Sequence, residues 1–373
     1  MRHACGVPMA DLISWETATN VATRVARHQE PLTPQERRVL EAEFNEVTAE
    51  AEELVAAETG LRSLAGAARA RVADRPQWVS ANVASFQRLL RPVTDKLGAQ
   101  LESNPVWSPM PASVSRRVTG AQVGLVLGWL STRVLGQYDQ LLIEEEQPEE
   151  QDIVYYVGPN VVSIERRYGF PPREFRLWLA LHEVTHRAQF TGVPWMRDHF
   201  LSLVGKTLDG IDPDPKQLLE ALRRAFDEFR SGHNPLNEGG LLTVISGPEQ
   251  RAAIQEIGGL MSLLEGHGDI TMDRAGADRV PHAAWFSRAL KERRRQRGLT
   301  KILSVLIGMD AKLRQYEQGE NFIEAVEAAG GRGLLDKVWR GPEWLPSWAE
   351  IRTPADWIAR AGTGAGPAPL AIG

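Results

Sequence analysis

Two histidines and a glutamate near the middle of the chain have the spacing of a metal site. His182, Glu183 and His186 form the pattern HExxH, and they follow an apolar run over residues 175–181 that predicts a helix. Residues four apart share one face of a helix, so both imidazoles can reach a single metal ion. Glu183 lies about 100° further round the axis, where it can reach a water on the metal. These residue types at this spacing indicate a zinc-dependent hydrolase with Glu183 as general base.

The competing interpretation of the same residues is a buried helix with two hydrogen-bonded core histidines. The chain has 8 histidines and 48 acidic residues, so chance placement gives roughly 0.02 matches to the pattern. The predicted helix also has a stop signal, with Gly192 as a cap and Pro194 beyond it. The metzincin extension of the motif is excluded, because Gln189 and Gly192 occupy the positions where it requires Gly and His.

Glu265 is the predicted third protein ligand. It shares one face of the helix predicted over residues 249–275 with Asp269, whereas His267 points about 200° away. Asp269, one turn later, can accept the free N–H of a ligand histidine and so fix its tautomer. This Glu-x-x-x-Asp spacing resembles the second half of the gluzincin signature found in thermolysin-like peptidases. His267 and, after it, His199 are the alternative third ligands.

A donor to the developing oxyanion would complete such a site, and it is often Tyr or His in zincins. Tyr316 is the first candidate, followed by Tyr155, Tyr156 and His199, and none of them lies in a diagnostic motif. A structural tyrosine with a hydrogen-bonded hydroxyl is the competing interpretation for each. The predicted strands near Tyr155 could bind an extended peptide by strand addition or form an ordinary hairpin.

Helical periodicity dominates the rest of the chain. Residues 10–75 indicate helices, and the further predicted helices cover about 76–90, 173–190, 216–230, 249–275, 280–297, 300–316 and 320–329. Strong strand signals occur at 153–157 and 161–164, separated by Gly-Pro-Asn. Loops are expected at 144–152, 212–215 and 231–237, a last helix after Pro354, and a disordered tail from 362.

A row of glycines at multiples of four indicates a tight helix contact. Gly120, Gly124, Gly128 and Gly136 would each cost about 1 kcal/mol against alanine in a helix interior. Their regular spacing therefore predicts that the backbone of another helix packs closely against this one. A membrane glycine zipper is the weaker interpretation in so short a segment.

Composition excludes several classes of protein. The 373 residues are 43% hydrophobic and 24% charged, which is typical of a globular protein, and the net charge of −5 argues against a nucleic-acid-binding function. A single cysteine, Cys5, permits no intramolecular disulfide and no cysteine-rich zinc site. The basic run 291–297 is interpreted as a solvated helix face, with a nucleic-acid adaptor as the alternative. No signal peptide or membrane span is predicted, so we expect a cytoplasmic protein.

Several segments together resemble a bacterial family of zincin-like hydrolases, usually labelled zinc-dependent metalloproteases and sometimes associated with deazaflavin coenzyme biosynthesis. The matching segments are HEVTHRAQF at 182–190, VPWMR at 193–197, VLGQYD at 134–139, Pro159-Asn160 and RQYEQG at 314–319. The resemblance covers about residues 10–360. It implies a zincin-like catalytic core within a mainly helical protein, and it implies no particular substrate.

The predicted fold is therefore α+β and predominantly helical, with a zincin-like core, a small sheet or hairpin and additional helices. The expected parts are a helical region at 1–145, the catalytic core at 146–290, a helical region at 291–361 and the tail at 362–373. The expected function is hydrolysis of a peptide or small amide with bound Zn²⁺, without a nucleic-acid or membrane partner. The alternative is a zincin-fold binding or scaffold protein that has no catalytic activity.

Overall fold

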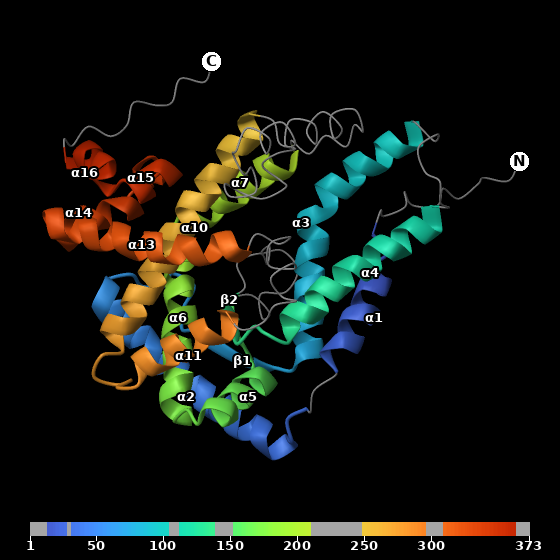
Figure 1. Cartoon of the computed structure of the whole chain (residues 1–373), viewed down its shortest axis with the longest axis horizontal. Helices are drawn as coiled ribbons and strands as arrows, with labels where there is room; N and C mark the ends of the chain where they lie inside the picture. The colour runs from blue at the N-terminus through green and yellow to red at the C-terminus, as the bar shows by residue number, and fades with distance from the viewer. Residues whose placement is uncertain are drawn as a thin grey trace, which may run out of the picture. The chain divides into compact units, whose positions relative to one another are not determined.

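The chain forms two compact units that are mostly helical. The computed structural model describes residues 13–27, 31–103, 112–138, 152–209, 248–295 and 309–362. The first unit comprises Met1–Asn45 and Arg69–Gly169, and the second comprises Glu46–Ala68 and Phe170–Gly373. Three strands form one small sheet among the helices (Figure 1). The predicted helical α+β fold is confirmed. Several other predictions lie outside the described residues: the helix at 216–230, the loops at 144–151, 212–215 and 231–237, and the tail.

The sheet belongs to the first unit and has its most buried strand in the middle. β3 (Ile153–Val157) pairs in parallel with β1 (Arg69–Ala73) and antiparallel with β2 (Gly136–Tyr138). All five residues of β3 are buried, which explains why its sequence is a continuous apolar run. The prediction of a strand at 153–157 is confirmed. The prediction that residues 10–75 are helical is wrong at β1, and β2 was not predicted.

The second predicted strand, residues 161–164, is wrong. These residues lie in α5 (Gly158–Tyr168), which has Pro159 in its first turn and ends at Gly169 in the left-handed conformation. Val161 and Ile164 are both buried while Ser163 between them is exposed, so the spacing is that of a helix. The β-branched side chains favoured a strand, but a proline in the first turn and a glycine cap are typical of a helix.

The motif residue Asn160 ties α5 to distant parts of the first unit. Its Oδ1 accepts a hydrogen bond from Arg75 Nε at 2.6 Å. Its Nδ2 donates to the backbone carbonyls of Ser131 at 2.8 Å and Val134 at 2.6 Å. Asn160 is buried, and these bonds satisfy both ends of its amide. This part of the family-like sequence is therefore a structural cross-link.

The predicted glycine contact joins α1 (Trp15–Ala26) to α4 (Ala112–Ser131), which lie side by side in Figure 1. A Cβ atom at Gly124 would lie 2.5 Å from the carbonyl oxygen of Ala18, and one at Gly128 would lie 2.9 Å from that of Ala22. A Cβ at Gly120 would overlap the Ser14 carbonyl in the same way. The predicted close approach is confirmed for these three glycines. Gly136 instead begins β2.

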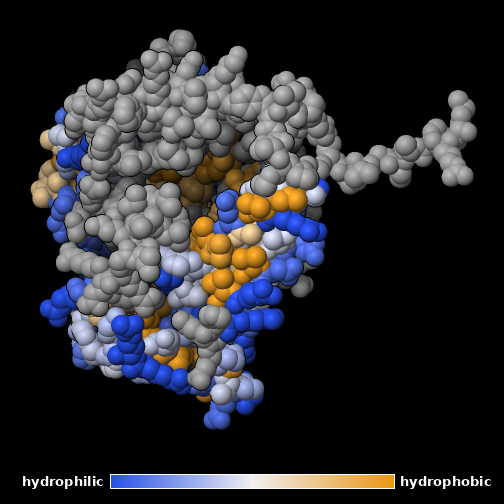
Figure 2. All heavy atoms as spheres, turned by 45° about the vertical axis from the view of Figure 1, so that its right-hand side comes forward, coloured by the Kyte–Doolittle hydropathy of each residue, from blue (hydrophilic) through white to orange (hydrophobic). Residues whose placement is uncertain are grey.

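α3 (Arg75–Ser103) packs on this pair and on the sheet. The beginning of α2 (Pro34–Thr59) contacts the sheet, where Phe44 stacks on Tyr156, and the later residues of α2 belong to the second unit. α4 also has large apolar side chains at its surface, namely Val114, Val118 and Leu125. Figure 2 shows apolar residues gathered beside hydrophilic ones on the face that α1 and α4 share. No helix in the described ranges is both long and apolar enough to cross a membrane.

The second unit is arranged around one long helix, α10 (Pro248–Ala275). It packs against α6 (Pro172–Gly192), α7 (Met196–Asp209) and α13 (Met309–Gly330) (Figure 1). α11 (Ala283–Arg295) packs on α6. The helix predictions for 173–190 and 249–275 are confirmed with slightly longer bounds. One continuous α13 covers 309–330 instead of two separate helices.

The contact between α10 and α13 is a backbone contact. A Cβ at Gly266 would lie 2.6 Å from the backbone nitrogen of Glu320 and would overlap the carbonyl carbon of Gly319. A Cβ at Gly319 would overlap the carbonyl of Ser262 in return. Gly266 is the residue after Glu265, so this contact also fixes the position of the predicted metal ligand.

The C-terminal segment closes a separate apolar cluster of the second unit. It contains α14 (Arg332–Leu335), two short 3-10 helices (Asp336–Trp339 and Pro342–Trp344), α15 (Trp348–Arg352) and α16 (Pro354–Gly362). Trp357 is fully buried against Phe322, and its Nε1 donates to the carbonyl of Trp344 at 2.8 Å. α16 begins at Pro354, as predicted, and its tryptophan anchors the segment.

Candidate metal centre

The two motif histidines lie side by side on α6. Their rings are nearly perpendicular, at 86°, with centroids 4.6 Å apart, and their Nε2 atoms are 3.2 Å apart. This is the outcome expected for residues four apart in a helix. The His186 side chain is 9% exposed and that of His182 is 24% exposed. His182 therefore lies toward the open side of the pair.

Glu265 on α10 supplies the third donor atom. Its Oε2 lies 3.4 Å from His186 Nε2 and 3.8 Å from His182 Nε2, and its side chain is 8% exposed. These three residues form a group whose donor atoms all lie within 4.8 Å of one another, which allows them to hold a metal ion. Gly268 faces both imidazoles, since a Cβ there would lie 3.4 Å from His186 Cε1 and 3.6 Å from His182 Nδ1. The missing side chain leaves room for the two rings.

The separation of these donor atoms fits tetrahedral zinc. Zinc–nitrogen and zinc–oxygen bonds of about 2.0–2.2 Å in tetrahedral geometry place neighbouring ligand atoms about 3.3–3.6 Å apart. The three observed separations are 3.2, 3.4 and 3.8 Å. Two imidazole nitrogens with one carboxylate oxygen are also the ligand types of a catalytic zinc site, which keeps one position open. The residues present therefore fit the predicted metal.

Asp269 lies one helical turn after Glu265, near the other nitrogen of His182. Its Oδ1 is 3.6 Å from His182 Nδ1. Burial, together with the negative charges of Glu320 and Glu265, raises the pKa of Asp269 to about 8. The structure thus brings Asp269 to the ring nitrogen that a tautomer-fixing partner of His182 would contact.

Negative charge surrounds His186. Burial alone would lower the pKa of His186, but its hydrogen bond with Glu265, the charges of Glu265 and Glu183, and a hydrogen bond with Gln189 raise it to about 9. Glu183 is buried and follows His182 directly on α6. A site with this excess of negative charge favours a cation.

Gln189 is a site residue that the sequence analysis did not identify. It is fully buried and lies three residues after His186 on α6. Its Oε1 is 2.9 Å from His186 Nδ1, and its Nε2 is 3.0 Å from both the Leu264 carbonyl oxygen and His267 Nδ1. The sequence signal that could have identified Gln189 is a long amide side chain at a buried position one turn after the second histidine.

His267 is not part of the three-residue metal group. Burial and the charge of His186 lower the pKa of His267 to about 4, so it is neutral. Its ring packs edge-on against Trp339, with centroids 5.0 Å apart. His199 is also outside the group and lies on α7 against Trp195.

The tyrosines predicted as oxyanion donors lie in different parts of the fold. Tyr155 and Tyr156 are buried residues of β3 in the first unit, where Tyr155 Oη accepts a hydrogen bond from Arg71 and Tyr156 stacks on Phe44. Tyr316 lies in α13, the helix that packs on α10, but its side chain is outside the described residues. Tyr316 therefore stays a prediction.

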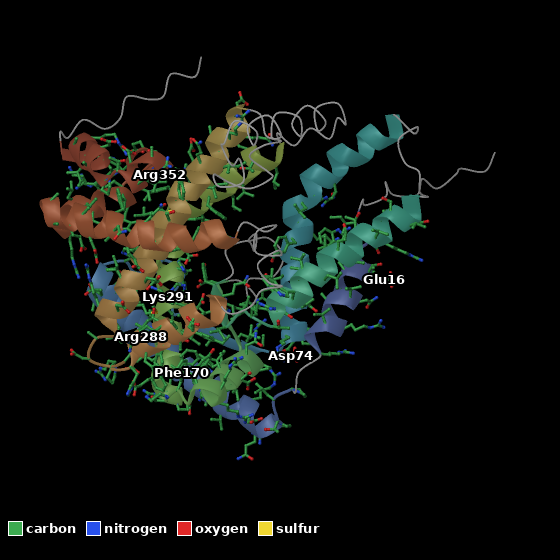
Figure 3. All side chains as sticks on the ribbon, in the orientation of Figure 1. Glu16, Asp74, Phe170, Arg288, Lys291 and Arg352 are labelled. Carbon is green, nitrogen blue, oxygen red and sulfur yellow. The ribbon has the colours of Figure 1, made fainter. Side chains whose placement is uncertain are left out.

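An aromatic cluster supports the first half of α6. Phe170, labelled in Figure 3, contacts Phe175 at 5.0 Å and Phe286 at 4.6 Å between ring centroids. Trp178, one turn before His182, stacks on Phe175, and its buried Nε1 has no hydrogen-bond partner among the described residues. Lys291, which begins the basic run, is exposed on α11 (Figure 3). Arg293 to Arg297 lie beyond the described side chains.

Comparisons with known proteins agree with this geometry. Residues 13–358 match the sequence profile of a family described as zincin-like metallopeptidase. A crystal structure described as "a putative hydrolase with a novel fold", from Chloroflexus aurantiacus, is similar with a TM-score of 0.68 and 31% sequence identity. The similarity covers 94% of this chain and 99% of that chain. A search of curated proteins gave no match.

Proposed function

This chain belongs to the zincin-like metallopeptidase family, and from that premise we propose that it is a zinc-dependent hydrolase that cleaves an amide bond with water. The observation that carries the proposal is the convergence of His182, His186 and Glu265 on one point with tetrahedral spacing. These three residues would hold the zinc. Bound zinc would polarise the substrate carbonyl and would lower the pKa of a bound water to about 7.

Glu183 carries the proton in the proposed reaction. It is adjacent to a proposed ligand but turned about 100° from the ligand face, and it is not part of the three-residue metal group. Glu183 accepts a proton as water attacks the amide carbonyl, and then donates it to the leaving nitrogen. A purely structural metal site has no need of such a base. Tyr316 is the proposed donor to the oxyanion, because α13 packs on the helix that carries Glu265.

The proposed substrate is a peptide or a small amide. It would approach from the side of His182 and Asp269, whose side chains are 24% and 25% exposed, because the other two ligands are nearly buried. The alternative to this proposal is a zincin-fold scaffold protein without catalytic activity.

Metal content and turnover measured in four variants test this proposal. Elemental analysis of the wild type should find roughly one zinc per chain, and His186→Ala and Glu265→Ala should lose it. Glu183→Gln should keep its zinc and lose at least about 10²-fold in the hydrolysis of a fluorogenic peptide mixture. Glu174→Gln is the matched control, since Glu174 lies on the same helix and pairs at the surface with His282.

Each result has a definite meaning. Zinc retained in Glu265→Ala would contradict the assigned ligand set, and zinc lost from Glu183→Gln would contradict the assigned base. A wild-type protein that binds zinc but hydrolyses nothing in the mixture would favour the scaffold. A wild-type protein that binds no zinc would refute the proposed function.

A further inference from the structure

We infer that Gln189 is a positioning residue that fixes both the tautomer and the orientation of His186 as a metal ligand. The inference rests on the proposed zinc site, and it assigns a role to a residue outside the HExxH motif. It is carried by the hydrogen bonds of one fully buried side chain.

The orientation of the Gln189 amide follows from the chemistry of its neighbours. A backbone carbonyl oxygen can only accept a hydrogen bond, so the group that faces Leu264 O at 3.0 Å must be the NH₂ end. The other end, Oε1, then faces His186 Nδ1 at 2.9 Å. An amide oxygen can only accept, so His186 Nδ1 must carry a hydrogen.

This hydrogen determines how His186 can bind a metal. With Nδ1 protonated, the lone pair of the neutral ring is on Nε2. Nε2 is the atom that lies 3.2 Å from His182 Nε2 and 3.4 Å from Glu265 Oε2. Gln189 therefore points the lone pair toward the common centre of the three donors.

The same amide also sets the distance between two ligands on different helices. Leu264, whose carbonyl accepts from Gln189, immediately precedes the ligand Glu265 on α10. Gln189 thus connects His186 of α6 to the backbone beside Glu265. Its second donor reaches His267 Nδ1 at 3.0 Å, which holds the amide from a third direction. His267 then supports the site without being a ligand.

The two ligand histidines differ in what holds them. His182 has the partly exposed carboxylate of Asp269 at 3.6 Å, whereas His186 has a neutral, fully buried amide at 2.9 Å. The bond to the amide is shorter and shielded from water. His186 is therefore held in place before the metal binds, and Gln189 is responsible for this.

The test compares zinc affinity in Gln189→Met and Gln189→Glu by competition with a chromophoric chelator. Methionine fills a similar volume but accepts no strong hydrogen bond, so zinc binding should weaken about 10–100-fold. Glutamate can still accept from Nδ1–H but cannot donate to Leu264 O, so its zinc affinity should fall by less than that of Gln189→Met. Thr185→Val is the matched control, since Thr185 is equally buried on α6 but its hydroxyl donates within that helix, to Leu181 O.

The opposite order would overturn the inference. If Gln189 serves only to fill space, Gln189→Met will bind zinc like wild type and Gln189→Glu, with a buried acid, will bind worse. A second measurement needs no variant. Long-range ¹H–¹⁵N spectra of histidine-labelled, zinc-loaded wild type should show His186 protonated at Nδ1, and coordination through Nδ1 would refute the inference. A wild type without zinc affinity would instead refute the proposed function.

Discussion

Replacing Gly266 by alanine should damage the second unit and its metal group together. Gly266 lies where α10 touches α13, and an added Cβ would overlap the Gly319 carbonyl carbon and lie 2.6 Å from Glu320 N. Both neighbours are backbone atoms, so no side-chain rotation can relieve the clash. The two helices must move apart by roughly 1 Å to restore van der Waals contact.

The expected magnitude combines two opposing effects. Overpacking costs about 1–3 kcal/mol, and a clash between two backbones should cost the upper value. Alanine in a helix interior recovers about 1 kcal/mol relative to glycine. The net loss in the free energy of unfolding should be about 2 kcal/mol, which lowers Tm by roughly 4–8 °C in a unit of this size. Because Glu265 moves with its neighbour, zinc affinity should fall at least about tenfold, since such sites tolerate displacements of about 0.5 Å.

Gly205→Ala is the matched control. Gly205 is also inside a helix, α7, but an added Cβ would meet no atom of the described residues within 4 Å. This variant should gain up to about 1 kcal/mol and bind zinc normally. Urea denaturation and chelator competition measure both quantities in the two variants. The reasoning fails if Gly266→Ala equals Gly205→Ala in stability, or if it loses stability with no change in zinc affinity.

Three further predictions concern charge and burial. The pKa of His186 is raised from about 6.5 in the unfolded chain to about 9 in the folded protein, so its protonation stabilises the metal-free protein fully below pH 6.5. This contribution should be lost as pH rises through about 9, while zinc affinity increases. A Tm that does not change from pH 7 to 9 without zinc would contradict this. Glu52→Leu should lower the free energy of unfolding, measured by urea denaturation, by about 3–5 kcal/mol. The reason is that it removes the carboxylate 2.6 Å from the charge of Arg187, whose side chain is 1% exposed. A loss below about 1 kcal/mol would show that the pair contributes no more than a surface ion pair. Trp178→Phe should destabilise the protein less than Trp357→Phe on thermal denaturation. Within the described part of the chain, only the second change removes an indole hydrogen bond, at 2.8 Å. Equal losses would show that the buried Trp178 N–H is satisfied in solution.

The sequence predicts the parts of the site that local periodicity controls. HExxH sets the relation of His182 to His186 because both are on one helix, and the Glu-x-x-x-Asp spacing placed Glu265 and Asp269 on one face of another. That the two helices meet was an expectation from zinc chemistry, and the structure brings them together. Helical geometry also favoured Glu265 over His267, and His267 lies outside the metal group.

The missed features depend on partners that are distant in the sequence. β1 has the sequence RARVA, which lacks a strand pattern, and it pairs with β3, about 84 residues later. Gln189 belongs to the site only because Leu264 and His267 meet it from another helix. No local pattern contains these contacts, so propensity cannot predict them.

The alternation of the chain between the two units has a consequence for its synthesis on the ribosome. Residues 46–68 belong to the second unit, but residues 69–169 return to the first before the second continues at Phe170. At about 5–20 residues per second, the segment 46–68 waits roughly 5–20 s before the rest of its unit begins to be made. Glu52, whose partner is Arg187, is among the residues that wait. The first unit is fully synthesised during this interval, and the candidate metal ligands, which all follow, are added to a chain that already contains it.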